Sequence, residues 1–206
     1  MGWRSRSRQS GQEGTTLIEL LVALTVFGLI IVGIFVVWEY SQRAYFQGSE
    51  AAELQQNARV AMEQMVREIR QAGYDPCRYT TGCTSAFDPV QPSIFPIQAF
   101  SASSIWVRAD RNANGSTGDA DESVCFYRDG GGVLRRKTTG GDCSSGGEEL
   151  ARNITSFTLT YLKADGSAAA TWSEIKLVRI AIAARETFMG SPLTVGLRSD
   201  VRLRDR

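Results

Sequence analysis

The chain has 206 residues, with 23 lysine and arginine side chains, 22 aspartate and glutamate side chains, and no histidine. Without histidine, Ser-His-Asp and Cys-His catalysis and most catalytic zinc sites are excluded. With a net charge of +1, the chain lacks the excess of positive charge that is typical of nucleic-acid-binding proteins. No glycine-rich phosphate-binding loop precedes a predicted helix. The composition therefore predicts a protein that is not an enzyme and does not bind nucleic acid.

A polar leader, residues 1–14, precedes an apolar run over residues 15–38. From Leu17 the run covers about 22 residues, or about 33 Å as a helix, which matches the hydrocarbon thickness of a bilayer. A secretory signal peptide has a shorter apolar region of about 7–15 residues and a small-residue cleavage site, which this chain does not offer. The run is therefore predicted to be a transmembrane helix.

The leader also predicts the topology of the span. Its basic residues are Arg4, Arg6 and Arg8. Positive residues beside a membrane helix favour the cytoplasmic side, so the N-terminus is expected in the cytoplasm and the remainder of the chain outside it.

One carboxylate, Glu19, lies near the start of the apolar run. An acidic side chain in such a segment costs roughly 2.5–3.5 kcal/mol, so a partner or a task is expected for it. The alternative is that Glu19 marks the interface where a plain anchor helix leaves the lipid.

The segment Gly14–Glu19, with the sequence GTTLIE, resembles the processing site of type IV prepilins and of type II secretion pseudopilins. The resemblance implies that a prepilin peptidase cuts after Gly14 and that Thr15 becomes the N-methylated first residue. The family usually has phenylalanine there. The cut would leave the new amine four residues before Glu19, and pairing of that carboxylate with an amine of its own or a neighbouring subunit would direct filament assembly.

Residues 39–73 are predicted to continue the helix, because they lack proline and are rich in good helix formers. Apolar residues recur there at spacings of three and four and form one stripe. The members of the stripe are Leu54, Ala58, Ala61, Met65, Ile69 and Ala72. Gly73 and Pro76 predict the end of the helix. One amphipathic helix over residues 15–72 is expected, its second half packed on a head domain.

The stretch Ala61–Tyr74 is similar to the end of the long helix in PilW-type minor pilins, and is related to J-type pseudopilins of type II secretion. The resemblance implies a minor pilin of the bacterial inner membrane that joins a priming or tip complex and promotes pilus assembly. The partners it implies are major and minor pilins, the prepilin peptidase, the inner-membrane assembly platform and a tip adhesin. A J-type pseudopilin and a membrane-anchored periplasmic binding protein are the alternatives.

Residues 74–206 are predicted to form a periplasmic β-rich head, with a mostly irregular connection over residues 75–104. Short β-type runs separated by turn residues predict strands in the remainder. These are Ser104–Arg108, Ser123–Tyr127, Val133–Lys137, Ile154–Leu162, Ile175–Ala183 and Val195–Leu203. A helix with one apolar stripe and an antiparallel sheet make a two-layer α+β fold, which is the pilin fold that the resemblance implies.

Four cysteines follow the apolar run, and an even number in an exported domain predicts two disulfides with three connectivities. We favour Cys77–Cys83, which closes a short loop after the helix, and Cys125–Cys143, which ties a hairpin to the loop after it. Zinc is the alternative, but the chain has no histidine and no Cys-x-x-Cys spacing.

One loop, residues 110–122, approximates a calcium-binding pattern with oxygen ligands at alternate places and a glycine in the sixth. The candidate ligands are Asp110, Asn112, Asn114, Ser116 and Asp121. The other interpretation is a hairpin loop rich in Asn, Asp and Gly, which ordinary turn chemistry favours. No other cofactor is expected.

Overall fold

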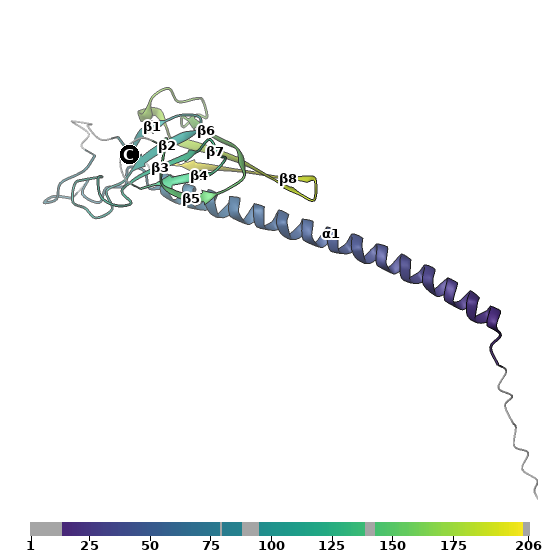
Figure 1. Ribbon diagram of the computed structural model, residues 1–206. Coiled ribbons are helices and arrows are strands. Elements are labelled where there is room, and N and C mark those ends of the chain that lie inside the picture. The colour runs from purple at the N-terminus through teal and green to yellow at the C-terminus, as the bar shows by residue number, and fades with distance from the viewer. Residues whose placement is uncertain (1–13, 79, 88–94, 139–142, 204–206) are drawn as a thin grey trace, which may run out of the picture. The chain divides into compact units, whose positions relative to one another are not determined.

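The computed structural model describes residues 14–78, 80–87, 95–138 and 143–203 (Figure 1). The predicted leader, with Arg4, Arg6 and Arg8, lies outside the described residues except for Gly14. The chain forms two compact units, Met1–Gln47 and Gly48–Arg206. The segment boundaries that the sequence predicts at residues 14, 38 and 73 stay predictions.

The N-terminal part of the structure is one long helix, α1, which runs from Leu17 to Arg70. It begins at Leu17 because Thr16 caps it: the Thr16 hydroxyl and carbonyl oxygens accept the Glu19 N–H at 3.4 and 3.1 Å. At the other end Gly73 has a φ of 78°, a left-handed conformation that favours glycine and ends the helix as predicted. The helix is thus two residues shorter at each end than the predicted range 15–72.

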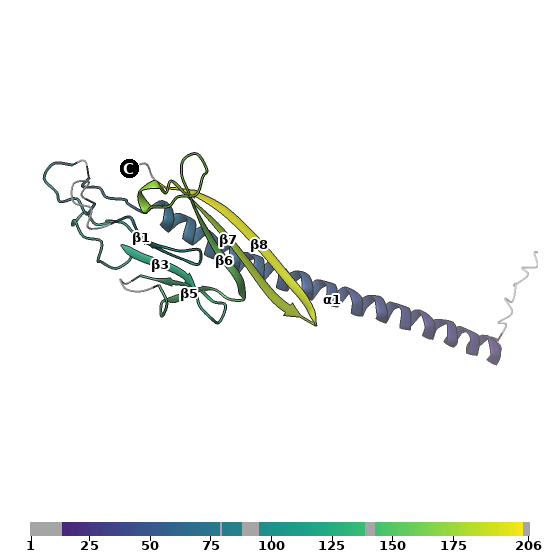
Figure 2. The same cartoon turned by 90° about the horizontal axis from the view of Figure 1, so that it is seen from above.

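In the described residues after α1, eight strands form two antiparallel sheets. The first sheet has the order β1-β2-β3-β4-β5, a meander of Ile97–Phe100, Ser104–Arg108, Ser123–Arg128, Leu134–Lys137 and Glu148–Ala151. The second has the order β6-β7-β8, with Ile154–Leu162, Leu177–Phe188 and Ser191–Arg202, and a short 3-10 helix at Trp172–Glu174. The two sheets lie side by side over the second half of α1 (Figure 2). The predicted α+β fold is confirmed, with two sheets where one was expected.

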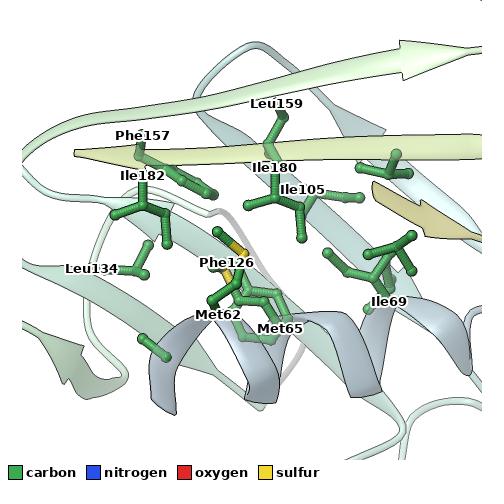
Figure 3. Packing of buried hydrophobic residues seen from close by; sticks show 14 of the residues in the cluster. Met62, Met65, Ile69, Ile105, Phe126, Leu134, Phe157, Leu159, Ile180 and Ile182 are labelled. Atoms are coloured by element: carbon green, nitrogen blue, oxygen red, sulfur yellow. The ribbon is translucent and has the colours of Figure 1, made fainter. Parts of the chain in front are cut away.

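The core lies between the second half of α1 and the inner faces of both sheets. All six residues of the predicted helix stripe are buried, with Met65 and Ile69 fully so. Figure 3 shows Met65 of α1 facing Phe126 of β3, near Ile180 of β7. The stripe is therefore the face that holds the helix on the head, through apolar surface removed from water.

Strands β1 and β5 were not predicted, and three strands are longer than predicted: β3 by one residue and β7 and β8 by three residues each. Strand β1 falls inside the segment expected to be irregular, so that expectation was wrong for Ile97–Phe100. Strands β7 and β8 pair over twelve residues each and are joined by Met189 and Gly190. These two residues have φ values of 46° and 80°, as in the type I′ turn of a tight hairpin.

Candidate functional site

The segment before α1 is exposed and irregular. Gly14, Thr15 and Thr16 precede the first helical residue, and a Cβ placed on Gly14 would meet nothing within 4 Å. Exposed backbone outside regular structure is where a peptidase gains access to a peptide bond. The predicted scissile bond, between Gly14 and Thr15, lies in such backbone.

Glu19 lies in the first turn of α1, where a carboxylate suits the positive end of the helix dipole. Its side chain is exposed, and no basic side chain in the described part of the chain pairs with it. Thr15 lies outside the helix, so regular helical spacing does not hold its nitrogen one turn from Glu19. The carboxylate is available to a cation from another molecule.

The first part of α1 presents an apolar surface on all sides. Its large side chains are exposed from Leu17, at 78%, to Trp38, at 56%. By length and composition this helix can cross a membrane, and none of its apolar span is buried within the protein. An exposed apolar surface of this extent is typical of a segment that lipid or another protein covers.

Gly28 and Gly33 leave small recesses in that apolar surface because glycine has no side chain. A Cβ placed on Gly28 or Gly33 would meet nothing within 4 Å, so neither glycine is required by packing within the chain. Gly33 lines a shallow apolar groove together with Ile30, Ile34 and Trp38. Small residues on a membrane helix allow another helix to approach closely.

In the head, the structure forms the two disulfides that the sequence analysis favours. Cys77 is joined to Cys83 and Cys125 to Cys143, with Cα–Cα distances of 5.5 and 5.7 Å. The first closes a loop after α1, and Asp75 orders that loop by accepting the Cys77 N–H at 2.8 Å. The second ties β3 to the segment between β4 and β5.

The candidate calcium loop connects β2 and β3. Asp110 is fully buried, whereas Asn112 and Asn114 are exposed and their amide nitrogens donate to Asp119 at 3.0 and 2.6 Å. The hydrogen bonds from the two asparagines lower the pKa of Asp119 below its ordinary value. The Ser116 hydroxyl accepts the Gly118 N–H at 3.1 Å.

Asp121 is directed away from the other predicted ligands, because its carboxylate accepts a hydrogen bond from Arg136 at 2.9 Å. Its neighbour Glu122 faces the loop instead and accepts the Arg111 and Asn112 N–H groups at 2.8 and 3.1 Å. The sequence pattern missed Glu122 because that residue occupies the thirteenth place rather than the twelfth.

Arg136 also connects the head to α1. Its Nε donates to Glu68 of α1 at 2.8 Å, and both side chains are buried. Burial alone would lower the pKa of Arg136, but the hydrogen bond that Arg136 donates to Asp121 and the charge of Glu68 outweigh it and raise that pKa. One signal for this pair was present in the sequence, since Glu68 lies three residues after Met65 and so interrupts the apolar stripe with a charge.

Two family models match the chain. Residues 9–35 match the model described as the prokaryotic N-terminal methylation motif. Residues 47–203 match the model described as prepilin peptidase-dependent protein B. No curated protein is similar enough to the chain to count as a match.

Proposed function

The chain belongs to the family of prepilin peptidase-dependent protein B, and from this premise we propose that it is a PilW-type minor type IV pilin that promotes pilus assembly. That membership, with the N-terminal methylation motif, confirms the resemblance to type IV prepilins. In the proposed role the protein joins a priming or tip complex through its N-terminal helix.

The main support for the proposal is that Glu19 has no ion-pair partner in the described chain and lies at the start of a helix whose apolar side chains are exposed. Hydrolysis of the bond between Gly14 and Thr15 releases the leader and leaves a cationic amine on Thr15, which stays cationic after N-methylation. A buried carboxylate without a cation is costly, and an amine from a neighbouring subunit removes that cost. Pairing of this kind would set the register in which each helix enters a filament.

The rest of the first half of α1 supports assembly by packing. Its apolar side chains are covered by lipid before assembly and by neighbouring helices afterwards, and Gly28 and Gly33 leave room for such helices. In this mechanism the inner membrane holds the helix, the cytoplasm holds the leader, and the periplasm holds the head.

The head is proposed to select partners among major and minor pilins, the assembly platform and a tip adhesin. Exposed side chains on the second half of α1 line a groove that includes Gln56, Arg59 and Val60, on a helix whose opposite face is buried in the head core. We further propose that the protein acts by assembly and catalyses no reaction, in line with the lack of histidine.

Mass spectrometry of the protein purified from its own cells tests the proposal. The expected mature chain begins at Thr15, with one methyl group on its amine, and the variant Gly14→Val retains the leader. A chain that still carries residues 1–14 would contradict the proposal and favour an ordinary membrane anchor. Recovery of the mature protein in sheared surface pili, rather than only in the membrane, would separate a pilin from a pseudopilin.

A further inference from the structure

Two carboxylates are buried at the two ends of the loop between β2 and β3. The exposed fraction is 0% for Asp110 and 2% for Glu122. The loop ends are held together by the Ala109 N–H, which donates to the Glu122 carbonyl oxygen at 2.9 Å. The two acidic residues therefore enter and leave the loop at the same place.

Both carboxylates point into the same turn and accept only backbone N–H groups. Asp110 accepts from Ala113 at 2.7 Å through Oδ1 and from Gly115 at 2.9 Å through Oδ2. Glu122 accepts from Arg111 and Asn112 through Oε1. Its second oxygen, Oε2, is buried and has no hydrogen-bond partner.

Neither charge is balanced within the described part of the chain. No lysine or arginine forms an ion pair with Asp110 or Glu122, and the nearby Arg136 pairs with Asp121 and Glu68 instead. Buried carboxylates are ordinarily paired with a cation or coordinate a metal, because an uncompensated buried charge is costly. Two such groups facing one turn make this loop a candidate cation-binding site.

We propose that this loop binds one calcium ion through the carboxylates of Asp110 and Glu122, with neutral oxygens of the loop completing the coordination. No three acidic or cysteine side chains of the described residues gather to hold a metal, so the neutral oxygens must supply most ligands. Carboxylates combined with amide and backbone carbonyl oxygens are a donor set that calcium accepts and that binds it weakly in extracellular modules.

The ligand set differs from the one that the sequence pattern predicts, since Glu122 takes the place of Asp121. The sixth-place glycine has a structural reason: Gly115 has a φ of 77°, and a Cβ there would lie 2.9 Å from the Thr84 carbonyl oxygen. The loop is thus closely packed against Thr84, the residue that follows the Cys77–Cys83 disulfide.

The test uses the full chain purified in detergent and titrated with calcium chloride in a calorimeter. We expect one site with a Kd on the order of 10⁻⁴–10⁻³ M. At ten times the Kd, calcium should raise the Tm by about 3–6 °C. A wild-type chain that shows neither heat of binding nor a change in Tm would overturn the proposal.

Variants locate the site. Asp110→Asn and Glu122→Gln are each expected to weaken calcium binding at least tenfold, whereas the control Asp200→Asn, a surface acid paired with Arg179, should bind as the wild type does. Wild-type affinity in both loop variants would place the ion elsewhere and refute the assignment.

A further measurement does not depend on the folding of the loop variants. The Trp106 indole N–H donates to the hydroxyl of Ser123, the residue after Glu122, at 2.7 Å. Terbium bound in place of calcium should therefore show indole-sensitised luminescence that calcium displaces and that Trp106→Phe weakens. Luminescence unchanged by Trp106→Phe would contradict binding in this loop.

Discussion

Glu19 is the one acidic side chain in the apolar span of α1. Its replacement by glutamine keeps the shape of the side chain but removes the charge that the amine of a neighbouring subunit would meet. Breaking a buried ion pair costs about 3–5 kcal/mol. We expect Glu19→Gln to reduce surface pili at least tenfold, measured by immunoblot of sheared filaments.

The matched control is Glu39→Gln on the same helix. Glu39 is exposed and pairs with Arg43 one turn later, an arrangement worth only about 0.3–0.5 kcal/mol. This variant should assemble as the wild type does. If Glu19→Gln and Glu39→Gln gave equal amounts of surface pili at equal protein levels, the proposed role of Glu19 in assembly would be contradicted.

At the residue scale, the sequence predicts well what is local. Gly14, Thr15 and Glu19 are recognised from six adjacent residues, and the structure adds only that Thr15 precedes the helix. The position of Glu68 in the apolar stripe indicates a buried partner, but Arg136 lies 68 positions away, so no local pattern identifies which residue that partner is. The orientation of Glu122 likewise depends on how the ends of its loop pair.

At the scale of elements, the helix was the most predictable part of the fold. The six-residue stripe follows the helical period, and every member is buried. Strands β2 and β6 have the predicted bounds because each is a β-type run between turns. Strand β1 follows a proline-rich segment, and β5 has the sequence EELA, so only pairing with a neighbouring strand makes these short edge segments β-structure.

The packing of α1 on the sheets can be tested at its centre. Met65 has an exposed fraction of 0% and faces Phe126 (Figure 3). We expect Met65→Ala to lower the free energy of unfolding of the head by about 2–5 kcal/mol, because it removes buried methylene groups and leaves a cavity. Urea denaturation of the purified chain, followed by near-UV circular dichroism, measures this change.

Val60 on the same helix supplies the comparison, since it is 56% exposed. Val60→Ala should change the free energy of unfolding by no more than about 0.5 kcal/mol. If both variants lost the same stability, the buried stripe would not be the surface that holds the helix on the head.

At the scale of the whole molecule, surface ion pairs make stability depend on pH. The hydrogen bond from Arg135 holds the pKa of Asp129 below its ordinary value of 3.8, and Arg179 has the same effect on Asp200. Because these pKa values are depressed in the native state, the unfolded chain binds more protons as the pH falls. The stability that the pairs add is present above about pH 4 and is lost as the pH falls through the native pKa values.

We therefore expect the Tm to change little between pH 7 and pH 5 and to fall below about pH 4. Circular dichroism melts at constant ionic strength measure it. The double variant Asp129→Asn and Asp200→Asn should lose slightly less Tm on acidification than the wild type does. The difference is small because Asp200 is exposed and Asp129 is only partly buried. A Tm that rises on acidification below pH 4 would contradict the sign of the dependence.

The positions of the two disulfides have a mechanical consequence. The chain has four cysteines, all of them paired, and the crosslinks close stretches of only 6 and 18 residues. Neither bond ties α1 to a β-strand. In the proposed filament, tension between α1 and the strands would first be resisted by side-chain packing and by the Glu68–Arg136 contact. Since only the backbone after Arg70 would then join them, the strands could separate from α1 without breaking a covalent bond.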